Sequence, residues 1–225
     1  MNYESWNVER FSAELTAKLV AGLAGVRDAA ALAMAVTECA AAAEAVCGAR
    51  PMACAAGCPY CCVLNVAILL PEAMVMANWL RERLSPPELA AVQKSLAAHR
   101  SLARWMDDEE RIIKSMACPL LDAAGSCSLH PARPLACRGV TSLDSNSCRQ
   151  AFSPIITDEV RLVPVDLLRK AAYDAAFTAL AEALRFNGLD DRSIELGSGV
   201  LAFLERPERR EQFLNGEKLP DLLWQ

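Results

Sequence analysis

The stretch CAAGCPYCC, residues 54–62, decides how the chain is interpreted, because it places four cysteines within nine residues. Relaxed disulfide bonds among all four are excluded, since each bridge needs Cα atoms ~4.4–6.8 Å apart and suitably directed side chains. A loop that curls around a cation can instead direct closely spaced thiolates to one centre. The stretch therefore predicts a metal or iron–sulfur site with four ligands: Cys54, Cys58, Cys61 and Cys62.

A second cysteine group follows in CPLLDAAGSCSLHPARPLACRGVTSLDSNSC, residues 118–148. Thiolates are soft donors, and sets of four suit zinc or iron–sulfur clusters. Eight thiols allow two four-thiolate sites, one cluster with a second structural site, or one site that draws on both groups and holds them together. The second group adds four predicted ligands: Cys118, Cys127, Cys137 and Cys148.

Arginines accompany the second group and complement its expected charge. Four thiolates around Zn²⁺ or a [4Fe–4S]²⁺ core leave a net charge of about −2 by formal addition. Arginine keeps its proton in such surroundings, which makes it a suitable partner for that charge. We therefore predict that Arg133 and Arg138 contribute to cofactor binding.

The spacing of the first group bears on which metal is bound. Cys54, Cys58 and Cys61 form C-x3-C-x2-C, the spacing with which radical S-adenosylmethionine enzymes bind three irons of a [4Fe–4S] cluster. Those enzymes need the motif after the first strand of a β/α barrel, whereas here it follows an alanine-rich helix without β/α alternation. The barrel is therefore disfavoured. We expect a [4Fe–4S] cluster or iron, with zinc as the alternative, because the Cys61-Cys62 pair is unusual for a simple zinc ribbon.

Composition favours a helical fold. Of the 225 residues, 53% are hydrophobic but only 6% aromatic, and alanine, the best helix former, is abundant. We predict a mainly α fold, a helical bundle around an irregular cysteine-rich metal-binding core with at most a small β-hairpin, placed near the turn at 122–125. Helices are expected at 4–24, 28–47, 71–84, 85–116, 164–187, 193–205 and 207–214, with a break allowed within 85–116.

The chain is predicted to form a single domain, residues 1–225. Its metal-binding core would span residues 50–150, flanked by helices in 1–49 and 151–225.

Outside the two groups, Cys39 and Cys47 lack companion ligands, and a free cysteine behaves as a small buried hydrophobe. Both are expected to pack in the core, whereas His99, in a charged helix, is expected to face solvent.

Charge and targeting signals narrow the choice of partners. The net charge is −5 and there is no long basic run, so nucleic acid is not an expected partner. The N-terminus lacks a secretory signal, and the apolar stretch 29–46 contains Glu38 and Glu44, which argues against a membrane span. We expect a cytoplasmic protein, where ten cysteines indicate metal or redox chemistry rather than structural disulfides.

The order of these motifs resembles the CxxCxxCC, or YkgJ-type, family of zinc- or iron-chelating cysteine-cluster proteins. The resemblance covers roughly residues 50–150. It rests on the first cysteine group, on Cys118-Pro119, on GSCSL at 125–129, on RPLACR at 133–138, and on Cys148. Here the gap between Cys54 and Cys58 is one residue longer than the family name implies, and His130 stands where tyrosine is common. The resemblance implies metal or iron–sulfur binding.

Three functions are compatible with the sequence. The first is a cytoplasmic metal-binding protein whose cysteine thiolates hold an iron–sulfur cluster, iron or zinc. The second is a cluster- and S-adenosylmethionine-dependent protein lysine N-methyltransferase, which a similar signature in flagellin lysine N-methylases implies. The third is an interaction module held together by structural zinc. Metal ions are the expected partners throughout, with a protein substrate or partner in the second and third. No glycine-rich phosphate loop, H-E-x-x-H or G-x-S-x-G motif supports another enzyme class.

Overall fold

The computed structural model describes residues 6–25, 27–155 and 161–224. The fold is mainly helical, as predicted, with a single two-stranded antiparallel sheet in the described residues. Its larger helices are α1 (Val8–Leu23), α2 (Ala29–Cys47), α3 (Leu70–Arg83), α4 (Pro86–Ala103), α8 (Leu167–Phe186) and α9 (Leu196–Glu205). Its short helices are α5 (Asp108–Ile113), α6 (Leu135–Gly139), α7 (Ser145–Ala151) and α10 (Glu208–Leu214). Single 3₁₀ turns are η2 (Tyr60–Val63), η3 (His130–Ala132) and η4 (Asp221–Trp224).

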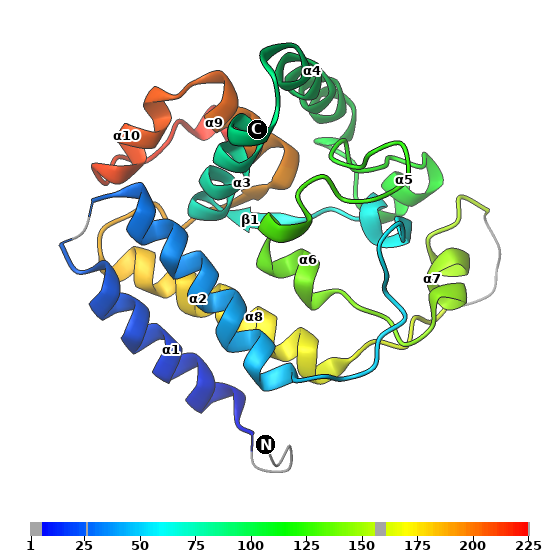
Figure 1. The fold of residues 1–225 in the computed structure, drawn as a ribbon, viewed down its shortest axis with the longest axis horizontal. Coiled ribbons are helices and arrows are strands. Elements are labelled where there is room, and N and C mark those ends of the chain that lie inside the picture. The colour runs from blue at the N-terminus through cyan, green and yellow to red at the C-terminus, as the bar shows by residue number, and fades with distance from the viewer. Residues whose placement is uncertain (1–5, 26, 156–160, 225) are drawn as a thin grey trace.

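Helix α8 is the central helix of one half of the molecule, and α1, α2 and α6 all pack against it (Figure 1). Its buried face is built mostly from alanines, which let neighbouring helices approach closely. Helix α9, apolar on nearly every side, has the same role in the other half, where α3 and α4 cover it. Contacts between α2 and α3 join the two halves.

Helix ends carry side-chain caps and terminal glycines. The Asp28 side chain accepts a hydrogen bond from the Ala30 amide at 2.7 Å and begins α2. Ser85 and Glu88 form a capping box at the start of α4. Gly188, which follows the last turn of α8, has a φ of +69° that favours glycine. The predicted helix at 4–24 is confirmed from Val8 onward, and residues 4 and 5 lie outside the described residues.

Three elements differ in detail from the expectations. The helix predicted at 85–116, in which a break was allowed, is interrupted, since α4 ends at Ala103 and α5 begins at Asp108. Residues 193–195 form strand β2, which pairs with β1 (Ala67–Leu69), whereas a helix was predicted to begin at Ser193. The turn at 122–125 forms, but it is closed by one isolated antiparallel bridge, Leu121 to Cys127, and the paired strands lie elsewhere. The β1–β2 pairing joins residues far apart in the chain, which local patterns do not encode.

Helix α2 is long and apolar enough to cross a membrane, judged by length and composition alone. In this fold it contacts α1, α3 and α8, and it buries Leu32, Ala35 and Cys39 against them. Its Cys39 and Cys47 are fully buried, which confirms the predicted packing role of both cysteines.

Candidate metal centre

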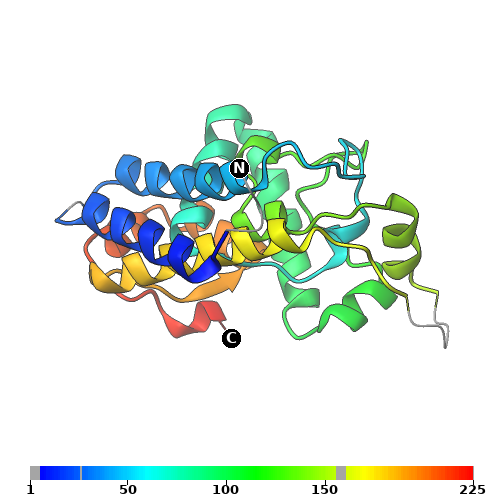
Figure 2. The same cartoon turned by 90° about the horizontal axis from the view of Figure 1, so that it is seen from below.

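The two cysteine groups lie on loops and short elements that follow the C-terminal end of α2 and precede α8 in the chain (Figure 2), and one of these elements, α6, packs against α8. Cys54 and Cys58 lie in the loop after α2, and Cys61 and Cys62 lie in η2. In the second group, Cys118 follows α5, Cys127 follows the turn at 122–125, Cys137 lies in α6 and Cys148 in α7. Because η2 contacts both α5 and α7, the first group is packed among elements of the second.

Backbone hydrogen bonds fasten the two groups together. The Cys118 amide donates to the Cys62 carbonyl at 2.6 Å, and the Ala53 amide donates to the Ser142 carbonyl at 2.8 Å. The Ser142 amide in turn donates to the Cys54 sulfur at 3.4 Å. Amide donors to sulfur are a common way to stabilise a thiolate. The loop at 53–62 is therefore tied to the second group at both of its ends.

Two glycines allow the cysteine loops to touch. Gly57 and Gly125 both have positive φ, at +81° and +74°. A Cβ on Gly125 would lie 3.4 Å from the Gly57 carbonyl oxygen, and a Cβ on Gly57 would lie 3.6 Å from the Ala124 carbonyl oxygen. Any larger residue would be strained in its own backbone and would contact the facing loop. The glycines thus set the closest approach of the two segments.

The turn that carries Gly125 is organised by Asp122. Its carboxylate accepts hydrogen bonds from the amides of Ala124 and Ser126, both at 2.8 Å, which is an Asx-type turn. The Asp122 amide donates to the Ser126 carbonyl, and the Ser128 amide donates to the Leu120 carbonyl. These bonds hold Cys127 at a fixed place beside Leu121.

Cys148 and the first group are electrostatic neighbours. Cys148 is 7% exposed, and burial raises the pKa of its thiol, while a hydrogen bond with Ser142 opposes that change. Negative charge on Cys54, Cys61 and Cys58 would raise the pKa of Cys148 further. Four thiols from both ends of the segment therefore lie near one another.

The remaining cysteines of the second group, Cys118, Cys127 and Cys137, are electrostatic neighbours of one another. Burial raises the pKa of Cys118 to about 12, and charge on Cys137 and Cys127 would raise it further. Burial likewise raises the pKa of Cys137 to about 12, opposed by Arg133 and reinforced by Cys61 and Cys127. A thiol with such a pKa is neutral at pH 7 unless a cation replaces its proton.

The adjacent pair Cys61 and Cys62 lies between the two neighbourhoods. A hydrogen bond with Cys62 is the largest cause of the raised pKa of Cys61, followed by burial. Cys61 is an electrostatic neighbour of both Cys148 and Cys137, and the Cys62 carbonyl holds the Cys118 amide. All ten cysteines are free thiols.

The thiols are suitable metal ligands, but they do not lie close enough together to bind one ion. Among the described residues, no three His, Cys, Asp or Glu side chains converge closely enough to hold an ion as they stand. Seven of the eight clustered cysteines are partly exposed, so their side chains have room to rotate. Zinc–sulfur bonds of ~2.3 Å would require such rotation toward a common point.

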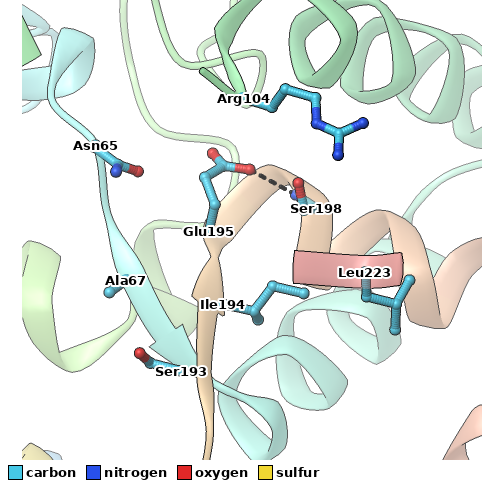
Figure 3. Close-up of a pocket in the computed structure, with 8 residues that line it drawn as sticks. All are labelled: Asn65, Ala67, Arg104, Ser193, Ile194, Glu195, Ser198 and Leu223. Atoms are coloured by element: carbon cyan, nitrogen blue, oxygen red, sulfur yellow. Dashed lines mark hydrogen bonds between the residues drawn. The ribbon is translucent and has the colours of Figure 1, made fainter. Parts of the chain in front are cut away.

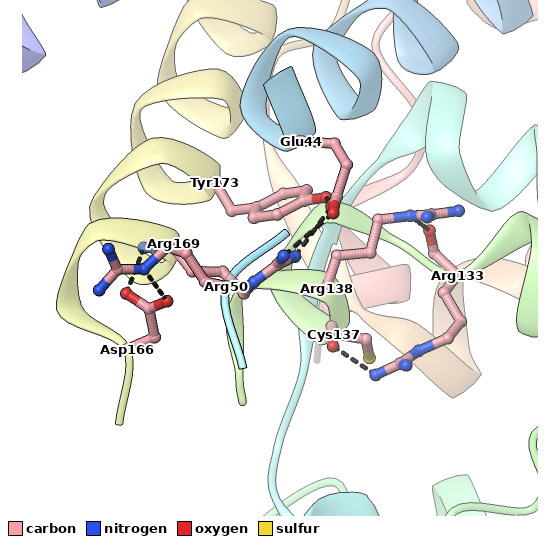
Figure 4. Close-up of polar contacts among 8 residues, drawn as sticks. All are labelled: Glu44, Arg50, Arg133, Cys137, Arg138, Asp166, Arg169 and Tyr173. Atoms are coloured by element: carbon pink, nitrogen blue, oxygen red, sulfur yellow. Dashed lines mark hydrogen bonds and ion pairs between the residues drawn. The ribbon is translucent and has the colours of Figure 1, made fainter. Parts of the chain in front are cut away.

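The two predicted arginines have different surroundings (Figure 4). The guanidinium of Arg133 donates to the Cys137 carbonyl, and its charge opposes the raised pKa of both Cys137 and Cys61. Arg138 donates to the carbonyls of Arg133 and Pro131 at 2.7 and 2.8 Å. Arg133 thus lies beside the thiols, whereas Arg138 braces the turn that precedes α6.

Glu72 supports the site in a way that sequence patterns did not suggest. This carboxylate is 1% exposed, and it accepts hydrogen bonds from the amides of Leu69 and Leu135, both at 2.8 Å. Burial raises its pKa to about 7, opposed by these two bonds. Leu135 begins α6, so Glu72 fixes the helix that carries Cys137. In the sequence, Pro71-Glu72 indicates the start of a helix. It does not indicate the hydrogen bond from the Leu135 amide.

A cleft of about 140 Å³ is lined by the lead into β1, by β2 and by the start of α9 (Figure 3). Its carboxylate, Glu195, accepts a hydrogen bond from the Ser198 amide at 2.8 Å and lies 3.8 Å from buried Arg111. This carboxylate serves the start of α9. His99 lies in the same region and is 8% exposed, which corrects the expectation that it faces solvent; burial lowers its pKa.

Comparison with known proteins agrees with the chemistry of the donor set. Residues 53–153 match the family model CxxCxxCC, described as "Putative zinc- or iron-chelating domain". The match begins at the residue before Cys54 and extends five residues beyond Cys148, so it contains both cysteine groups. No curated protein and no solved structure gives a significant match to the chain.

Proposed function

We propose that the protein binds iron, as an iron–sulfur cluster, through its clustered cysteines, since residues 53–153 match the family model of a zinc- or iron-chelating domain. The observation that carries this proposal is that hydrogen bonds join the two cysteine groups, from the Cys118 amide to the Cys62 carbonyl and from the Ser142 amide to the Cys54 sulfur. A cluster supplies electron transfer or an iron available to a ligand. Zinc is the alternative occupant, and it would serve only to hold the loops together.

We further propose that the eight thiols hold two centres. One would use Cys54, Cys58 and Cys148, the other Cys118, Cys127 and Cys137, and the adjacent pair Cys61-Cys62 would complete each set of four. The neighbour relations support this division, because Cys61 is close to members of both sets. Arg133 is suited to offset the negative charge that thiolates keep around a bound cation.

The ten free thiols support a reducing compartment, the cytoplasm, as the place of action. Protein lysine methylation is a second candidate that the same preparation tests. An enzyme of that kind must bind S-adenosylmethionine, whereas a metal-binding or structural module need not.

The decisive experiment is anaerobic purification from cells supplied with both iron and zinc, followed by iron, zinc and acid-labile sulfide analysis and a visible absorption spectrum. We expect stoichiometric iron and sulfide with brown absorption. Zinc without iron would assign the structural role. Neither metal at stoichiometric level would refute metal binding.

Single substitutions test the division into two centres. We expect Cys148→Ser and Cys127→Ser each to remove about half of the bound metal, because each breaks one four-ligand set. The double variant should lose nearly all of it. Complete loss in either single variant would instead indicate one shared centre.

A further inference from the structure

A cleft of about 340 Å³ opens beside the cysteine groups, between α2 and the turn that leads into α6. Residues from α2 and α3 give it an apolar wall, chiefly Val36, Ala40 and Val75. Arg133 and Arg138 line the other side. A cavity of this size with an apolar wall and a few convergent polar groups has the general form of a small-molecule site.

The one carboxylate that lines the cleft is already neutralised. Glu44 accepts two hydrogen bonds from buried Arg169, at 2.8 and 3.0 Å, and a third from the Tyr173 hydroxyl at 2.7 Å (Figure 4). This arrangement holds Glu44 on the cleft wall and occupies the oxygens with which it would bind a cation. A cationic ligand is therefore disfavoured.

The two arginines on the opposite side form no ion pair within the described residues, although the charge of Arg138 lowers the pKa of both Glu44 and Glu72. Within the described ranges, neither Arg133 nor Arg138 has an Asp or Glu oxygen within 4 Å of its guanidinium nitrogens. Their contacts are to the backbone carbonyls of Pro131, Arg133 and Cys137. Each guanidinium has five N–H donors in a planar fork, so donors remain for an anion after these bonds.

We propose that this cleft binds a small organic anion, a carboxylate on a short aliphatic body. The carboxylate would be held by Arg138 and Arg133, and the aliphatic body would lie along Val36, Ala40 and Val75. The apolar wall favours an organic anion over a mineral one. Arg133 contacts Cys137 as well as the cleft, so the ligand would lie next to the cysteine centre. The site goes beyond metal binding and does not depend on which metal is held.

Hexanoate is the probe, titrated by calorimetry or ligand-observed NMR into the protein as purified with its metal. We expect binding with a dissociation constant of about 1 mM, given so small a ligand. Hexylamine, which has the same body with the opposite charge, should bind at least tenfold more weakly. Inorganic phosphate, which lacks the body, should also bind more weakly. Equal affinity for hexanoate and either comparison compound would overturn the proposal.

Two exposed alanines on α2 provide a matched pair of variants. Ala41 lines the cleft and Ala45, one turn further along, does not. Ala41→Phe should fill the cleft and weaken hexanoate binding at least tenfold, whereas Ala45→Phe should leave it unchanged. Retained binding in Ala41→Phe would place the ligand elsewhere and refute the site.

Metal content is measured in the same samples, so the two proposals fail separately. Arg138→Gln should weaken hexanoate binding while thermal unfolding verifies that the variant is folded. Protein that binds hexanoate but contains no metal would refute the proposed function alone. Protein that contains metal but binds no hexanoate would refute this site alone.

Discussion

The carboxylate of Glu72, at the start of α3, accepts a hydrogen bond from the backbone amide of Leu135, at the start of α6. The same carboxylate caps its own helix through the Leu69 amide. One buried side chain therefore joins the helical frame to the segment that carries Cys137. Since a buried carboxylate without such donors would be costly, the two helices must be positioned together.

The buried position of Glu72 predicts a dependence of stability on pH. Its folded pKa of about 7 lies above its ordinary value of 4.5, so the folded protein holds the proton more tightly than the unfolded chain does. The stabilisation of the folded state by this tighter proton binding is fully present below pH 4.5, and it is lost as pH rises to about 7. The loss is on the order of 3 kcal/mol. The difference in unfolding free energy between wild type and Glu72→Gln, from urea denaturation at pH 5 to 8, should fall over this range.

Glu88 provides the control, because it has the same capping role at the start of α4 but is exposed. Hydrogen bonds from Ser85 lower the pKa of Glu88 rather than raise it. The Glu88→Gln difference should therefore not decline between pH 5 and 8. A decline equal to that of Glu72→Gln would contradict the assignment to Glu72.

Loss of a proposed ligand should release metal. We expect Cys58→Ser and Cys61→Ser to lower metal content and the melting temperature markedly, because binding at such sites is folding free energy, ~10–16 kcal/mol for structural zinc in peptides. Elemental analysis and thermal unfolding measure both effects. Cys39→Ala is the control: its thiol is fully buried in α2, so it should cost some stability but no metal. Metal loss from Cys39→Ala would overturn the ligand assignment.

The contact between the cysteine loops predicts a specific effect of a single methyl group. Gly125→Ala should weaken metal retention against a chelator, because it strains a positive-φ residue at the point where its loop contacts the Gly57 carbonyl. Gly25 also has positive φ, at +68°, but a Cβ there meets nothing within 4 Å. Gly25→Ala should therefore lower stability by ~1 kcal/mol and leave metal retention intact. Equal chelator sensitivity of the two variants would argue against a role for the loop contact.

A second pair of glycines tests the packing of α9. A Cβ on Gly199 would lie 2.8 Å from Ile194 Cγ2 and 3.2 Å from Ile68 Cδ1, so Gly199→Ala should destabilise the protein by ~1–3 kcal/mol. Gly22, within α1, has nothing within 4 Å of its Cβ position. Gly22→Ala should be neutral or stabilising by up to ~1 kcal/mol, since alanine is the better helix former. Chemical denaturation of both variants distinguishes these outcomes.

The helices could be predicted because their signals are local. Asp28 and the Ser85–Glu88 box mark helix starts, and Gly188 marks an end, whatever the rest of the chain does. The β1–β2 pairing could not be predicted, because it joins residues far apart in the chain, and three residues are too few to show a period. His99 was misjudged for the same reason, since α9 and the strand before it cover a helix face that is polar in sequence.

The candidate site, too, could be predicted from the sequence only in part. Cysteine spacing alone identified the region, because closely spaced thiols in such numbers favour metal binding. The tie between Cys62 and Cys118 and the buried Glu72 depend on the folded backbone. Their sequence signals, an adjacent cysteine and a Pro-Glu helix start, are too common to indicate a partner.

The hydrogen bond between Cys118 and Cys62 has a consequence for the order of folding. Helices α3, α4 and α5 all lie between these two residues in the chain. An ion shared across that connection is captured more readily after the intervening helices have assembled, because closing the flexible chain between the two residues first costs more entropy. Metallation should therefore be a late event, and a truncated chain that ends before Cys118 should leave its first four thiols open to mispairing.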